Sequence, residues 1–177
     1  LSLSLSLSLS LSLSLCASPQ LAIAPLRKAC KIQEEAECEK RANTLAKHYN
    51  TLASCLHKVA DHEAAVIAMK ESLAWAIHDQ GMAPEKSVQR FVGFHLQWTR
   101  TRTTGEEEEE DLSRFVNDLL SSAEESASRG GKLERLMHLL DQLLLAYRQH
   151  SNTVNYQLHL LDRLLALQEG TPIHRAR

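Results

Sequence analysis

Nine histidines and four cysteines carry most of the chemistry open to this chain, since these residue types act as bases, nucleophiles and metal ligands. Their spacing favours none of these uses. The sequence has no His-Glu-x-x-His motif, no Cys-x-x-Cys pair and no two histidines four residues apart. We therefore predict no metal-binding residue. The four cysteines are Cys16, Cys30, Cys38 and Cys55. We interpret them as buried, reduced thiols, which are typical of an intracellular protein.

A thiol nucleophile with a histidine base is the remaining catalytic arrangement. Cys55 has His48 and His57 nearby in the sequence, but residues two positions apart on a helix point away from each other. His57 and His62 lie on either side of a predicted turn at Asp61 and share no helical face. Glycine-rich phosphate-binding and nucleophile-elbow motifs are also missing from the sequence. The sequence thus predicts no catalytic residue, no cofactor-binding residue and no cofactor.

The composition describes a globular protein of ordinary size. Of the 177 residues, 44% are hydrophobic and 24% are charged. The net charge of −2 gives no electrostatic reason to expect binding to nucleic acid. No apolar run approaches the roughly 18 residues that a membrane helix needs. We therefore expect neither nucleic acid nor membrane as a partner.

Residues 1–15 alternate strictly between leucine and serine, and no initiator methionine precedes them. A reading frame that crosses a CT dinucleotide repeat produces this alternation, because the CTC and TCT codons specify leucine and serine. We interpret residues 1–19 as a low-complexity tail, disordered or artefactual, and the chain as a translated fragment of a larger gene. A secretory signal and an exposed strand are the alternatives, although the tail lacks a basic start and a continuous apolar core.

Beyond the tail, apolar residues recur at three- and four-residue spacing, which predicts helices nearly throughout. Glycines and prolines fall between these segments, and Asp61 and Ser151 or Asn152 are suitable N-caps. Pro25 is expected in the first turn of its helix or just before it. The predicted helices include residues 25–39, 40–60, 112–127 and 132–149. A third helix follows Asp61 and ends at Gly81, a fourth has Pro84 near its start, and a seventh follows Ser151 or Asn152 and ends before Gly170.

Several side chains of the predicted helices are expected in the core. His95 lies on an apolar stripe with Val88, Phe91 and Trp98, and we interpret it as a buried structural histidine. The aromatic residues Trp75, Trp98 and Tyr147 also lie on apolar faces. In the last helix, one stripe collects four residues: Val154, Leu158, Leu161 and Leu165.

These features predict an all-α fold, an irregular α-solenoid of antiparallel helical hairpins. Residues 46–79 resemble one tetratricopeptide unit, with small residues at Ala53 and Ala65 where two helices would approach closely. We expect hairpins over residues 20–100 and leucine-rich hairpins over residues 112–177. Between them, residues 101–111 contain five consecutive glutamates and read as a solvated acidic linker, or alternatively as a docking site for a basic partner.

The leucine-rich helices resemble part of the helical N-terminal region of vertebrate separase. In that family a leucine-rich helix also ends in Ala-Tyr followed by a basic residue, and the next helix ends before Thr-Pro. The resemblance covers residues 45–177 as an ordered series of segments: 56–58, 73–77, 82–83, 91–92, 136–148, 160–167 and 171–177. The Leu-Ser tail and Glu106–Glu110 correspond to no family element.

The resemblance implies a role in sister chromatid separation during mitosis. Separase is the cysteine endopeptidase that cleaves cohesin, with its catalytic histidine and cysteine in a caspase-like C-terminal domain to which nothing here is similar. This chain would then be a non-catalytic scaffold in the cytoplasm and nucleus. Its partners would be a securin-like inhibitory chaperone and the remaining domains of the same larger protein. The alternative is a tetratricopeptide-like adaptor that binds a peptide or partner protein.

Overall fold

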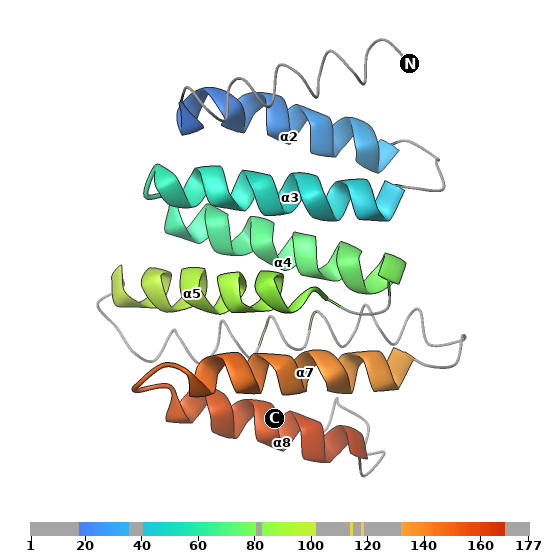
Figure 1. Cartoon of the computed structure of the whole chain (residues 1–177), viewed down its shortest axis with the longest axis vertical. Helices are drawn as coiled ribbons and strands as arrows, with labels where there is room; N and C mark the ends of the chain where they lie inside the picture. Colours follow the sequence, from blue (N-terminus) through green and yellow to red (C-terminus); the bar gives the residue numbers. More distant parts are fainter. Residues whose placement is uncertain are drawn as a thin grey trace. The chain divides into compact units, whose positions relative to one another are not determined.

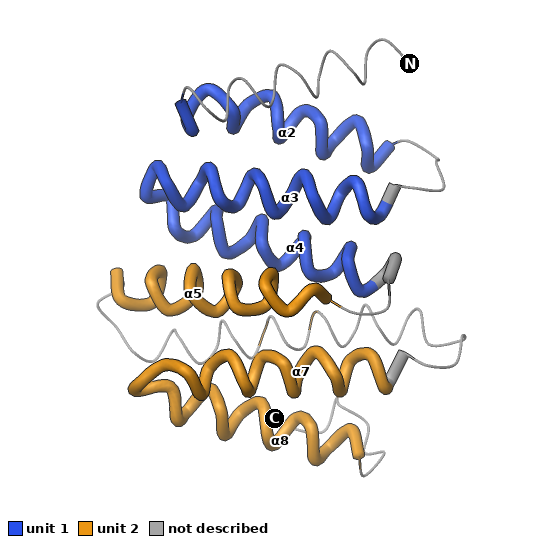
Figure 2. Tube along the Cα trace, viewed as in Figure 1, with its two compact units in different colours: residues 1–80 blue, residues 81–177 orange. Residues whose placement is uncertain are grey.

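The computed structural model describes residues 18–35, 41–80, 83–101, 114, 118 and 132–168. Over these residues the fold is all-α, as the sequence predicts, and no strand occurs among them. The Leu-Ser tail, the acidic run Glu106–Glu110 and most of the helix predicted at 112–127 lie outside the described residues. The chain divides into two compact units, residues 1–80 and 81–177, coloured separately in Figure 2. Residues 83–101 therefore group with the C-terminal half, whereas the sequence suggested grouping them with the preceding hairpins.

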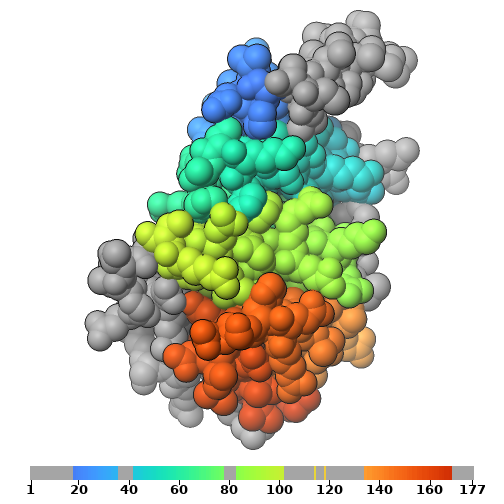
Figure 3. All heavy atoms as spheres, turned by 60° about the vertical axis from the view of Figure 1, so that its left-hand side comes forward, coloured from blue at the N-terminus to red at the C-terminus, as the bar shows by residue number. Residues whose placement is uncertain are grey.

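Unit 1 consists of α2 (Pro19–Glu35), α3 (Arg41–Lys58) and α4 (His62–Gln80). α3 packs against both α2 and α4, and the short turn between α3 and α4 makes them an antiparallel hairpin (Figure 1). In Figure 3 the blue atoms of α2 rest directly on those of α3. Ala53 and Ala65 are fully buried, as expected for the positions where two helices approach closely. Leu45, Met69 and Leu73 are likewise fully buried.

The turn between α3 and α4 has a defined geometry. The amide of Ala60 donates to the carbonyl of His57 at 3.1 Å, and the amide of Asp61 donates to the carbonyl of Leu56 at 3.0 Å. These two bonds are those of a Schellman motif, with Ala60 in the left-handed position at φ 63°. Asp61 then begins α4, because its Oδ1 accepts a hydrogen bond from the amide of Ala64 at 3.2 Å. The predicted N-cap at Asp61 is confirmed.

Pro25 lies inside α2, so the expectation that it sits in or before the first turn is wrong. The helix begins earlier, at Pro19, where a proline fits because the first helical amides have no intrahelical acceptor. Pro25 leaves the carbonyl of Leu21 without its helical donor. Leu21 is 67% exposed, so solvent is available on this side of the helix to replace the missing hydrogen bond. The buried side of α2 holds Ala22, Leu26, Ala29 and Cys30.

Unit 2 contains α5 (Glu85–Thr101), α7 (Lys132–Arg148) and α8 (Val154–Gln168). α7 packs against both α5 and α8, and α7 and α8 form a second antiparallel hairpin (Figure 1). Thr153, rather than Ser151 or Asn152, precedes α8 as its N-cap, and its carbonyl accepts from the amide of Gln157 at 3.0 Å. The Thr153 hydroxyl donates back to the carbonyl of Tyr147 at 2.7 Å, which ties the start of α8 to the end of α7.

α8 buries a different face from the stripe noted in the sequence. Val154, Leu158 and Leu165 are 63%, 55% and 54% exposed, and Leu161 is half-buried. The face that packs into unit 2 lies on the other side and holds Tyr156, Leu160, Arg163 and Leu167. Both stripes have the 4-3-4 spacing of a helix face, so periodicity alone could not decide between them. α8 thus has a covered side, where Arg163 lies among apolar residues, and an exposed side that is apolar.

Candidate functional site

A buried aromatic cluster joins the three helices of unit 2. The Tyr147 hydroxyl on α7 is hydrogen-bonded to Nδ1 of His95 on α5 at 3.0 Å. Tyr156 on α8 packs edge-on against His95, with ring centroids 5.5 Å apart, and also lies 5.3 Å from the ring of Tyr147. Phe91 and Trp98 complete the cluster at 5.9 Å from the His95 ring.

The environment of this cluster indicates a structural role. His95 is only 2% exposed and Tyr147 is fully buried, so no substrate can reach either group without unfolding the site. Burial, together with the neighbouring Tyr156, raises the pKa of Tyr147 well above its ordinary value, which keeps the phenol protonated. A hydrogen-bonded imidazole and phenol surrounded by rings hold three helices together. His95 and Tyr147 therefore lie in the core, as the sequence predicted, while Trp75 and Trp98 are half-buried.

The described thiols are poor nucleophiles. Cys30 and Cys55 are both free and buried. Burial, and secondly the charge of Glu34, raises the pKa of the Cys30 thiol to about 11. Burial also raises the pKa of Cys55, and Lys58 opposes this only in part. Because the thiolate is the reactive form, both cysteines stay in the unreactive thiol state at neutral pH. Cys16 and Cys38 lie outside the described residues.

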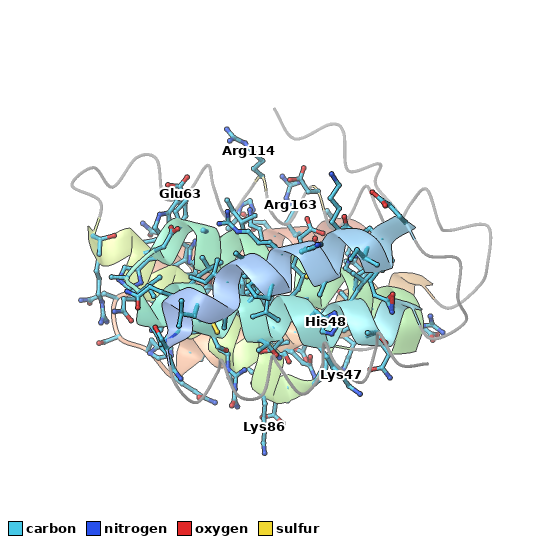
Figure 4. The ribbon with its side chains drawn as sticks, turned by 90° about the horizontal axis from the view of Figure 1, so that it is seen from above. Lys47, His48, Glu63, Lys86, Arg114 and Arg163 are labelled. Carbon is cyan, nitrogen blue, oxygen red and sulfur yellow. The ribbon has the colours of Figure 1, made fainter. Side chains whose placement is uncertain are left out.

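His48, His57 and Cys55 all lie on α3, and His62 begins α4. Lys47 and His48 lie side by side on α3 (Figure 4), two helical turns before Cys55, and burial lowers the pKa of His48. His57 and His62 come closer than their positions on either side of the turn suggested, with ring centroids 5.1 Å apart. Burial first, and His62 second, lowers the pKa of His57.

The described residues include no group of three or more histidine, cysteine or acidic side chains that could hold a metal ion. The sequence did not predict the His57–His62 contact. The Schellman turn brings the two helix ends that carry these rings together, and its left-handed position holds Ala60 instead of the usual glycine.

The most prominent surface feature is the exposed apolar stripe of α8, called here the outer stripe: Val154, Leu158, Leu161 and Leu165. It contains no charged residue over its length. α2 exposes a second, sparser apolar side with Leu21 at 67% and Ile32 at 48%. Single exposed apolar residues are common on protein surfaces, but an aligned series on one helix face marks a place where another protein element packs.

The chain was compared with known protein families, curated proteins and solved structures. No family model matches the chain, and neither a curated protein nor a solved structure matches it. Within the part of the chain that the structure describes, no helix is both long enough and apolar enough to cross a membrane.

Proposed function

We propose that this chain is a non-catalytic helical scaffold that resembles part of the N-terminal region of separase. The observation that carries the proposal is the outer stripe of α8. A helix that packs on one side and exposes an apolar stripe on the other is suited to a position between two neighbours. In a helical array each hairpin buries one face on the next, and a stripe of this kind is where the following helix packs.

The leucine-rich segments that carry the resemblance support this proposal through their packing. Leu136, Leu140 and Leu143 on α7 are at most 4% exposed, and Leu160 on α8 is fully buried. Both helices belong to one hairpin, whose second member presents the outer stripe. The proposed partners are therefore the remaining helices of the same larger protein and a securin-like inhibitory chaperone, in the cytoplasm and nucleus. The protease activity would reside elsewhere in that larger protein.

A tetratricopeptide-like adaptor is the second candidate, and one observation favours it. Ala53 and Ala65 are fully buried in the α3–α4 hairpin, as the small residues of such a repeat are. The hairpin of a single unit does not form a peptide-binding groove, since repeat proteins need about three or more stacked units for stability. The adaptor therefore requires further repeats of the same length in the same protein.

A binding measurement on the whole chain tests the first proposal. The securin-class protein of the same genome would be labelled with a fluorophore and titrated with residues 1–177, with fluorescence anisotropy as the readout. We expect saturable binding of the labelled securin-class protein. An unrelated disordered acidic protein of similar length serves as the control and should not bind. Equal binding of both proteins, or of neither, would contradict a scaffold of the separase type.

A further inference from the structure

Two imidazole rings meet at the turn that joins α3 to α4 (Figure 1). His57 lies in the last turn of α3, and His62 is the first residue of α4. Their ring centroids are 5.1 Å apart and their planes are inclined at 57°, so the rings are neighbours but are not stacked. Both side chains are half-buried, which leaves part of each in contact with solvent. A small dissolved ion can therefore reach the pair.

The backbone of the turn fixes the points from which the two rings extend. The carbonyl of His57 accepts the 3.1 Å hydrogen bond from the amide of Ala60, and the amide of Asp61 is bonded to the carbonyl of Leu56 at 3.0 Å. Asp61 in turn caps α4, so the residue that precedes His62 is held as well. Because these bonds exist without any ligand, little conformational freedom remains to be lost when both rings bind one ion.

The separation of the rings is that of two imidazoles on one zinc ion. Zinc binds imidazole nitrogen at about 2.0–2.1 Å with tetrahedral geometry, and the ring centre lies about 1.1 Å beyond that nitrogen. Two ring centres at about 3.2 Å from the ion and about 109° apart are then separated by about 5.2 Å. The observed separation of 5.1 Å agrees with this value. Rotation about the Cβ–Cγ bond redirects the nitrogens of a histidine but hardly moves its ring centre, and this torsion is soft.

The ring nitrogens are in a state that suits metal binding. Nδ1 of His62 is buried and has no hydrogen-bond partner among the residues that the structure describes. Burial first, and the charge of His62 second, lowers the pKa of His57, which keeps its imidazole neutral at pH 7. Neutral imidazole is the form that binds a metal ion.

We propose that His57 and His62 together bind one zinc ion across the α3–α4 turn, with water in the remaining positions. Structural zinc sites have four protein ligands, so a site with two is open and fills only as the zinc concentration rises. The bound ion would link the end of one helix to the start of the next and stabilise the hairpin of unit 1. This site does not depend on the scaffold function proposed above.

Urea unfolding of unit 1 at increasing zinc concentration tests the site. The whole chain, with Trp98→Phe so that only Trp75 of unit 1 reports, would be unfolded at about pH 7.5 in the presence of zinc chloride alone. Binding to the folded turn lowers the unfolding equilibrium constant by a factor of one plus the ratio of zinc concentration to Kd, about 11-fold at ten times Kd. Isothermal titration calorimetry with zinc chloride would supply the Kd, as the binding that is lost when either histidine is replaced.

His57→Gln and His62→Gln each remove one ligand, and His150→Gln is the matched control because His150 is exposed and lies outside the helices. Each of the first two substitutions should weaken zinc binding by at least about tenfold, since even outer-shell partners of metal ligands contribute about 10–100-fold. Both should also abolish the stabilisation of unit 1 by zinc, while circular dichroism without zinc confirms that each variant is folded. His150→Gln should keep the wild-type response. Zinc that fails to stabilise wild-type unit 1, that stabilises the variants equally, or whose effect is lost in His150→Gln would overturn the proposal.

Discussion

Replacing Ala60 by glycine should stabilise unit 1, although glycine usually weakens helical structure. Ala60 holds φ 63° in the Schellman turn between α3 and α4 and is exposed, so the substitution removes no core packing. A residue with a Cβ in the left-handed region is destabilised by about 1–2 kcal/mol. Glycine relieves this strain but loses about 0.5–1 kcal/mol more backbone entropy on folding than alanine does. The strain term is larger, so we expect a net stabilisation of about 0.5–1 kcal/mol.

Asn152 is the matched control, because it has nearly the same backbone conformation at φ 65° and is also exposed. Asparagine tolerates the left-handed region better than alanine, so Asn152→Gly should change the stability of unit 2 by less than about 0.5 kcal/mol in either direction. The two substitutions place the same residue in the same conformation and differ only in the side chain that they remove.

The two tryptophans allow each unit to be followed separately. Trp75 lies in α4 of unit 1 and Trp98 in α5 of unit 2. Urea unfolding of Ala60→Gly would be monitored by Trp75 fluorescence in a Trp98→Phe background. Asn152→Gly would be monitored by Trp98 in a Trp75→Phe background. Equal stabilisation by both glycines, or a loss of stability in Ala60→Gly, would refute left-handed strain as the cause.

Three further predictions follow from the same structure. Pro25→Ala restores an amide inside α2 and should stabilise that helix by up to about 3 kcal/mol. Hydrogen exchange of α2 peptides would measure this stabilisation as slower exchange, and faster exchange would contradict the prediction. Tyr147→Phe removes the 3.0 Å hydrogen bond to His95 and should lower the free energy of unfolding of unit 2 by about 1–3 kcal/mol. Urea unfolding would measure the loss, and a smaller loss would show that the bond contributes little to the stability of unit 2. Leu158→Gln with Leu165→Gln should leave the helical circular dichroism intact and reduce concentration-dependent self-association in light scattering. Unfolding of this double variant would show that the outer stripe is buried.

The sequence predicts the helices well because their signals are local. Asp61 caps α4 as expected, and the stripe of Val66, Met69 and Leu73 is buried. His95 could be placed in the core because its neighbours one turn away on the helix are apolar. Each of these inferences depends on residues within one or two helical turns.

The surroundings of each helix could not be predicted in the same way. α8 has two stripes of equal spacing, one wholly apolar and one that includes Arg163, and its packing against α7 shows that the stripe with Tyr156, Leu160 and Arg163 is the buried one. The contact of Glu34 with Tyr49 joins residues on two helices whose register no local pattern specifies. Ala60 gave no turn signal because alanine rarely adopts the left-handed conformation. Pro25 indicated a helix start, but Pro19 already occupies that position.

The full-length transcript that contains this chain tests the proposed scaffold most directly. Its open reading frame would be sequenced through the codons that follow Arg177 and translated. A separase-type scaffold predicts further irregular helical hairpins and then a caspase-like domain with a catalytic histidine and cysteine in the same frame. A reading frame that contains no such domain, or that continues as regular 34-residue repeats, would contradict it.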